Sequence, residues 1–229
     1  MLLILEKLDY YNLVILISLI ISIIYLFKKN RNYKNTHYLI LSIILLVTLL
    51  EAYATYLANS GIYNTYYYNI FFVFIETNLI LLYFLLLSDS KKNKMIAFLA
   101  IALFSTWYFI NAMFFQNLVT HFQTNSYLLG GLLIIIFCGR VFYEIFTLKI
   151  FSEGNLLSIP HFWIITGIFF FYAVSFMHFI SIQIPGIDSL FLRSISPIVR
   201  IMSCFMYLLM GLSFHFPLIF KDHPQVVAK

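Results

Sequence analysis

Charged residues are scarce in this sequence. Only 10% of its 229 residues are charged, whereas 62% are hydrophobic and 20% are aromatic. A soluble domain carries roughly 25% charged residues, so this chain has less than half the charge that an ordinary wetted surface needs. The scarcity excludes a soluble globular protein, a disordered chain and a nucleic-acid binder, and it predicts several membrane-spanning helices.

Cysteines are also scarce, and sequence motifs that bind a metal or a cofactor are missing. Cys138 and Cys204 lie inside apolar runs, so we expect buried thiols rather than a disulfide or a metal site. The predicted spans contain no lysine for a retinal Schiff base and no HxxxH or HExxH pair for zinc. His178 and His215 lie roughly 20 Å apart along the membrane normal, too far to share a haem. We therefore predict neither a metal nor a cofactor.

Long apolar runs dominate the chain instead. A bilayer core about 30 Å thick needs roughly 20 mostly apolar residues per helix. Short polar connections separate seven such runs, at residues 11–27, 38–58, 68–87, 95–115, 126–148, 160–182 and 197–220. The sequence therefore predicts an all-α integral membrane protein, a seven-transmembrane-helix bundle formed as a single domain by residues 1–229.

Prolines mark the ends of the last two predicted spans. Pro160 and Pro197 are each expected in the first turn of a helix, where the missing N–H costs nothing. Pro217 predicts the point where the last span ends or kinks.

Lysine and arginine residues predict the orientation. Ten of them follow the first, third, fifth and seventh runs, whereas only Lys7 and Arg193 lie on the opposite side. Basic residues concentrate in cytoplasmic loops, so we expect the N-terminus outside and the C-terminus in the cytoplasm. The first run lacks the basic start and the cleavage site of a signal peptide and should remain a helix. We expect the protein in the bacterial cytoplasmic (inner) membrane, with the lipid bilayer as its first partner.

Two glutamates lie deep inside neighbouring predicted spans. Glu51 and Glu76 are each about eight residues from the outer end of their span, so their carboxylates should lie at one depth. A charge in the membrane costs a few kcal/mol or more, which makes each one a candidate for function. The pair predicts a site for a ligand, an ion or a proton. The alternative is that both pack between helices, hydrogen-bonded to tyrosines or threonines.

The last span carries a stripe of polar and small residues. Its spacings of four, three, four, four and four residues keep the stripe on one helix face, which should point into the bundle. The stripe consists of Ser196, Arg200, Ser203, Tyr207, Gly211 and His215.

Four further residues lie at a membrane depth similar to that of the two glutamates and extend the candidate site. Arg200 and His178 lie at a similar depth, and Trp107 and Asn111 lie one turn apart in the outer half of the fourth span. The alternatives are a snorkelling arginine, a satisfied interior histidine, and packing or lipid contact for the other two. The hypothetical ligand- or proton-binding cluster consists of Glu51, Glu76, Trp107, Asn111, His178 and Arg200.

A second polar layer is predicted in the inner half. Arg140 and Glu144 are one turn apart on the fifth span and should form a local ion pair near the cytoplasmic interface. His215, near the inner end of the last span, is expected to join them in a layer that faces a cytosolic partner.

Two segments resemble a known group of proteins. They are LLEAYATYLANSGIYNTYYYNIFFVFIETNLILLYF (49–84) and SIPHFWIITGIFFFYA (158–173), and they resemble a largely uncharacterised group of small seven-transmembrane-helix proteins of Bacteroidota, often found near sensor kinases. The resemblance implies the seven-helix fold and a role in signalling. The matching positions are Glu51, Glu76, Pro160, Phe162, Trp163 and Tyr172.

The leading hypothesis is a membrane sensory or scaffold module. A small ligand, lipid or proton would act at the outer-half cluster, and repacked helices would signal to a cytoplasmic or membrane partner such as a sensor kinase. One alternative is a proton- or cation-coupled transporter or channel that uses Glu51 and Glu76. Another is an intramembrane lipid-modifying enzyme with Glu51, Glu76 and His178 as acid, base and orienter. No motif identifies a reaction, so no catalytic residue is assigned and a non-enzyme is expected. The oligomeric state stays open.

Overall fold

The chain folds into helices. The computed structural model describes residues 9–28, 33–88, 90–147, 156–186 and 189–220, with the backbone alone described for 189–193, and these ranges contain no strand. The helices are α2 (Tyr10–Leu26), α3 (Lys34–Asn59), α4 (Thr65–Tyr67), the π-helix η1 (Tyr68–Glu76), α5 (Thr77–Leu87), α6 (Lys91–Phe114), α7 (Thr124–Thr147), the 3₁₀ turn η2 (Leu156–Ser158), α8 (Pro160–Gln183), α9 (Ser189–Leu212), the 3₁₀ turn η3 (Ser213–His215) and α10 (Phe216–Ile219).

The long helices identify an integral membrane protein. Six in the described part of the chain are long and apolar enough to cross a bilayer, counting α4–η1–α5 and α9–α10 as one each. In the apolar stretch of each of these helices, between 28% and 39% of the residues are buried inside the bundle, and the others lie wholly or partly on its outward surface. That outward surface is apolar. Lipid contact requires such a surface, whereas soluble proteins rarely expose an apolar surface of this extent to water. Exposed examples are Leu49, Phe98, Leu103 and Ile136. The first helix, α2, is equally apolar but only 17 residues long.

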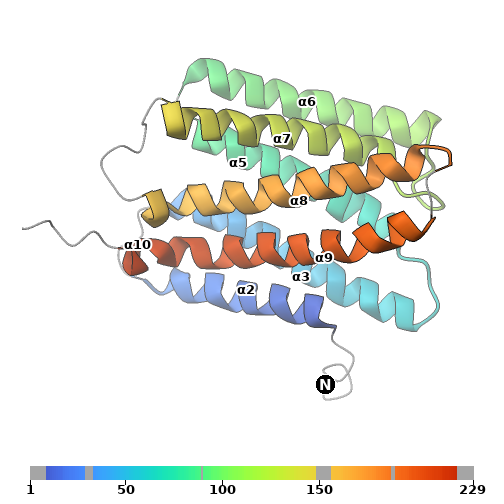
Figure 1. Ribbon diagram of the computed structural model, residues 1–229, viewed down its shortest axis with the longest axis horizontal. Helices are drawn as coiled ribbons and strands as arrows, with labels where there is room; N and C mark the ends of the chain where they lie inside the picture. Colours follow the sequence, from blue (N-terminus) through green and yellow to red (C-terminus); the bar gives the residue numbers. More distant parts are fainter. Residues whose placement is uncertain (1–8, 29–32, 89, 148–155, 187–188, 221–229) are drawn as a thin grey trace, which may run out of the picture.

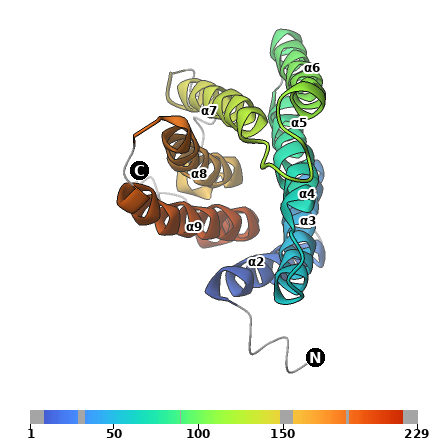
Figure 2. The same ribbon diagram turned by 90° about the vertical axis from the view of Figure 1, so that its right-hand side faces the viewer.

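Consecutive long helices pack side by side and form a ring that the pairing of α2 with α9 closes. Seen along the helices, α6, α5, α3 and α2 form one row, and α7, α8 and α9 form a second row facing it (Figure 2). We call the end where α2 begins the N-terminal end of the bundle. It also carries the α6–α7 and α8–α9 connections, at the right in Figure 1, and α10 lies at the opposite, C-terminal end.

Two glycines allow close approach of neighbouring helix backbones in the ring. A Cβ at Gly211 of α9 would lie 2.6 Å from the backbone oxygen of Ser18 on α2, and a Cβ at Gly167 of α8 would lie 3.1 Å from Cα of Met206 on α9. Small residues let membrane helices approach to van der Waals contact of their backbones. The ring can therefore close at α9, which packs tightly against both neighbours.

The predicted spans agree with the helices except at one start. Six runs begin within four residues of their helix, because first turns such as Lys34–His37 are polar and were left out of the apolar run. The last helix begins at Ser189, before the predicted start at residue 197, so the prediction that Pro197 opens it is wrong. The apolar pattern of SLFLRSIS continues the helix upstream, and membrane helices tolerate an interior proline. Pro160 does open α8, and the last long α-helix gives way to the 3₁₀ turn η3 shortly before Pro217, which lies in the first turn of α10.

Candidate ligand-binding cavity

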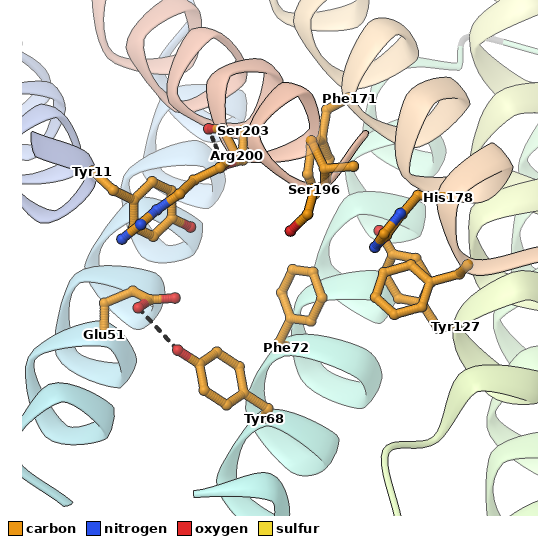
Figure 3. A pocket seen from close by; sticks show the side chains of 12 residues that line it. Tyr11, Glu51, Tyr68, Phe72, Tyr127, Phe171, His178, Ser196, Arg200 and Ser203 are labelled. Atoms are coloured by element: carbon orange, nitrogen blue, oxygen red, sulfur yellow. Dashed lines mark hydrogen bonds between the residues drawn. The ribbon is translucent and has the colours of Figure 1, made fainter. Parts of the chain in front are cut away.

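A cavity of about 260 Å³ lies in the N-terminal half of the bundle, between the two rows of helices. Six elements contribute to its wall: α2, α3, η1, α7, α8 and α9 (Figure 3). The lining residues are Tyr11, Glu51, Tyr68, Phe72, Tyr127, Phe171, His178, Phe179, Ser196, Val199, Arg200 and Ser203. Of the predicted cluster, the structure brings Glu51, His178 and Arg200 to this one cavity.

Glu51 forms the acidic side of the cavity. It projects from α3, and its Oε2 accepts a hydrogen bond of 3.0 Å from the hydroxyl of Tyr68, the first residue of η1. Figure 3 shows this pair at one side of the cavity, with Tyr11 of α2 beside it. A single phenol hydroxyl leaves a carboxylate with unused acceptor positions. Glu51 therefore has capacity to bind a further donor or cation.

Arg200 has its own partners at the start of α2. Its guanidinium forms an ion pair with Asp9, the residue just before α2. It also lies over two rings, 5.1 Å from the centroid of Tyr10 and 5.3 Å from that of Tyr11. Cations over aromatic faces at such distances are attracted by the ring quadrupole. The positive charge of Arg200 is thus already balanced at the start of α2.

His178 lies on the far side of the cavity from Glu51. His178 projects from α8 beside Tyr127, and Ser196 projects from α9 between the two sides (Figure 3). Nδ1 of His178 is buried and has no hydrogen-bond partner among the described residues. Buried polar atoms are rarely left unpaired, so this nitrogen is a candidate to contact a molecule in the cavity.

Glu76 does not line the cavity. It is fully buried at the end of η1, where its Oε1 accepts a hydrogen bond of 2.8 Å from the hydroxyl of Tyr207 on α9. The backbone oxygen of Tyr207 in turn accepts a hydrogen bond from the hydroxyl of Ser18 on α2. Oε2 of Glu76 is buried without a partner in the described part of the chain. Glu76 therefore links three elements below the cavity rather than sharing a site with Glu51.

The π-helix η1 is the irregular element of the site. Tyr68 and Phe72 project from it into the cavity, and Glu76 ends it. π-helical turns are rare and occur frequently at functional sites, because they change which residues share a face.

Asn69 fixes η1 to the α6–α7 connection. Its amide donates to the backbone oxygens of Leu118 and His121 at 2.7 and 2.8 Å, and its side-chain oxygen accepts from the backbone N–H of Gln123 at 2.9 Å. Its own backbone oxygen accepts a hydrogen bond from Tyr108. The connection at the N-terminal end of the bundle is therefore attached directly to the element that lines the cavity.

Trp107 and Asn111 lie away from the cavity. Asn111 is fully buried and bonds to Gln116, Gln123 and Ser126, so it organises the start of α7. Trp107 stacks on Phe115 at a centroid distance of 6.1 Å. Depth placed both residues near the cavity, but they face the α6–α7 connection.

The predicted inner layer divides into two separate contacts. Arg140 and Glu144 form the expected ion pair at 3.1 Å, and Glu144 also accepts a hydrogen bond from Asn93. His215 does not join them, because its ring nitrogen bonds the backbone oxygen of Ile21 on α2 at 3.1 Å. α8 packs against both α7, which carries Arg140 and Glu144, and η3, which carries His215, and it separates them.

The polar stripe on the last span points inward from Ser203 to Gly211, as predicted, whereas Ser196 and Arg200 are exposed. Ser196, Arg200 and Ser203 line the cavity, and Tyr207 and Gly211 are buried below it. Sequence reasoning missed Asp9, although its position directly before an apolar run with an arginine at similar depth was a usable signal.

Two buried histidines at the C-terminal end were also missed. His37 contacts Ser22 on α2, and His161 contacts the hydroxyl of Tyr83 at 2.8 Å. Among the described residues no group of three or more histidine, cysteine, aspartate or glutamate side chains is placed to hold a metal ion.

No protein-family model, no curated protein and no solved structure matches this chain.

Proposed function

We propose that the protein is a seven-span membrane sensory module that binds a small ligand in the cavity. The observation that carries the proposal is that six elements of the ring each contribute side chains to one space, which is lined by aromatic residues and a few polar and charged ones. A ligand there would contact most helices of the ring. If it bound one arrangement of the helices more tightly than another, it would shift the population toward the arrangement that it binds better.

The proposal includes an orientation. In the sequence, ten basic residues follow the first, third, fifth and seventh apolar runs against two on the other side, so the C-terminal end of the bundle faces the cytoplasm of a bacterial inner membrane and the cavity lies in the outer half. The 17-residue α2 then also crosses the membrane, as the first of seven spans.

α9 is the route by which ligand binding would reach the cytoplasmic side. It lines the cavity with Ser196 to Ser203, bonds Glu76 through Tyr207, and touches α2 at Gly211. A rotation or shift of α9 would therefore move η3 and α10 at the C-terminal end. We propose that a membrane or cytoplasmic signalling protein, such as a sensor kinase, reads this movement.

A thermal-shift experiment in nanodiscs tests ligand binding in the cavity. A panel of small amines, carboxylates, phosphonates and neutral alcohols is compared on the wild type and on Ser203→Phe, which fills the cavity from a residue that is 5% exposed. At least one class should raise the melting temperature of the wild type and not of Ser203→Phe. The proposal fails if every class acts on both proteins alike.

Glu76 favours a second candidate, a proton- or cation-coupled transporter. A fully buried carboxylate with one unpartnered oxygen, at the end of a π-helix, is the kind of group that carries ions through membrane bundles. Proteoliposomes should then show proton or sodium flux that Glu76→Gln abolishes. Flux that is absent from the wild type removes this candidate and leaves the sensory proposal intact.

A further inference from the structure

We infer that the ligand of the cavity is a small organic monocation, an amine or a quaternary ammonium with an apolar body. The inference rests on the proposed function, because it names the ligand class of the same cavity. Three observations carry it: the charge left over in the cavity wall, the aromatic faces around that charge, and the size of the space.

The charge balance of the site leaves one negative charge. Asp9 neutralises Arg200 through their ion pair, and the two rings of Tyr10 and Tyr11 hold the guanidinium in place. With histidine and tyrosine counted as neutral, Glu51 is the one acidic residue among those that line the cavity. A charge at membrane depth is costly unless it is paired, so a ligand with one positive charge completes the site.

The walls around Glu51 are aromatic. Tyr68 holds the carboxylate by its hydroxyl at 3.0 Å, and Tyr11 and Phe72 lie beside them (Figure 3). Aromatic faces attract cations, and quaternary ammonium groups are recognised by cages of such rings. The same faces repel an anion and give no advantage to a neutral polar group. The far side, with Tyr127, Phe171 and Phe179, suits the apolar body of the ligand.

The volume limits the ligand to a small molecule. At about 260 Å³ the cavity is slightly below the range of roughly 300–1,000 Å³ that is common for small-molecule sites. It holds an amine with one ring or a short chain, or the ammonium end of a lipid headgroup, but not an acyl chain. Both sources share the same chemistry.

Benzyltrimethylammonium is the test probe. Its binding to the full chain in phosphatidylglycerol nanodiscs is measured by calorimetry, beside its neutral isostere neopentylbenzene and the anion phenylphosphonate. The inference predicts binding of the cation alone. Glu51→Gln should weaken it roughly ten- to a hundredfold, the range for a lost charged partner, whereas Glu51→Asp should retain most of it. Glu144→Gln, which removes a carboxylate from the Arg140 ion pair, should leave the affinity unchanged.

Asp9→Asn provides a second variant in case Glu51→Gln does not fold. It frees the charge of Arg200 and makes the site neutral overall, so the affinity for the cation should fall and that for phenylphosphonate should rise. A lipid source is distinguished by repeating the titration with phosphatidylethanolamine in the nanodisc, which should compete with the probe if headgroups enter.

The outcomes separate the inference from the proposed function. Binding of phenylphosphonate or neopentylbenzene in preference to the cation, blocked by Ser203→Phe, overturns the monocation and keeps the cavity as a ligand site. Cation binding that Glu51→Gln leaves unchanged also overturns the inference. If no probe and no class of the panel distinguishes the wild type from Ser203→Phe, both proposals fail.

Discussion

The hydroxyl of Tyr68 donates a hydrogen bond of 3.0 Å to Oε2 of Glu51, and this contact joins the π-helix to α3 at the edge of the cavity. The two residues lie on separate spans, 17 positions apart in the sequence. The bond holds the carboxylate toward the cavity without neutralising it, so Glu51 remains available to a ligand.

Tyr68→Phe should destabilise the protein modestly. A hydrogen bond to a charged group contributes roughly 1.5–3 kcal/mol in a buried site, and the partial exposure of Glu51 places the effect at the lower end. Thermal unfolding in nanodiscs measures the change. Tyr53→Phe is the matched control, since its exposed hydroxyl makes only a long contact of 3.4 Å with Tyr67, and its melting temperature should stay at the wild-type value. Equal melting temperatures for Tyr68→Phe and Tyr53→Phe would contradict the hydrogen bond between Tyr68 and Glu51.

Gly211→Ala should open the ring between α9 and α2. The added methyl group would lie 2.6 Å from the backbone oxygen of Ser18, so the helices must separate, at a cost of about 1–3 kcal/mol. Gly139→Ala on α7 is the control, because its methyl group would meet nothing within 4 Å and alanine favours a helix by about 1 kcal/mol. The first variant should melt below the wild type and the second at or above it. The reverse order would mean that α2 and α9 are not in close contact.

Glu76→Gln and Glu76→Ala should differ strongly. Glutamine keeps the shape and still offers an oxygen to the hydroxyl of Tyr207, so the protein should fold with a small loss. Alanine leaves a cavity and an unpaired buried phenol, which together cost roughly 2–5 kcal/mol. Urea or thermal unfolding of both variants measures this. If glutamine is as damaging as alanine, then the bundle requires the ionised carboxylate.

Asn69→Ala should loosen the α6–α7 connection locally. The side chain makes hydrogen bonds to Leu118, His121 and Gln123, and alanine replaces none of them. Hydrogen exchange followed by mass spectrometry should show faster exchange at residues 116–123, with little change at the C-terminal end of the bundle. Uniform acceleration along the whole chain would instead indicate a global loss of stability.

The fold could be predicted from hydropathy, because lipid imposes a simple rule on length and composition. Each apolar run corresponds to a helix, and the stripe from Ser203 to Gly211 points into the bundle. The start of α9 was placed too late at Pro197, since proline is usually found at a helix start but is tolerated inside a membrane helix.

Depth along a helix placed three of the six predicted residues correctly at the cavity, but it did not show where the other side chains point. Counting residues placed Glu51, His178 and Arg200 at one level, and the cavity joins them. The same count placed Glu76 at that level, but a π-helix carries more residues per turn than an α-helix, so side-chain direction cannot be read from α-helical spacing.

The sequence also could not show which side chains from different helices would become partners. Arg200 could pair with Glu51 or with Asp9, and only the position of α2 beside α9 decides for Asp9. Asn111 turns toward the α6–α7 connection because glutamine and serine partners from that connection and from α7 surround it, which depth alone does not reveal.

The existence of a reachable cavity is tested most directly by thiol labelling. Ser203→Cys and Ser213→Cys are made in a background in which Cys138 and Cys204 are alanine. Both serines are buried, but Ser203 lines the cavity and Ser213 packs at the C-terminal end. We expect N-ethylmaleimide to label Ser203→Cys readily and Ser213→Cys hardly at all, with bound benzyltrimethylammonium slowing the first reaction. Labelling of Ser203→Cys as slow as that of Ser213→Cys would contradict the account.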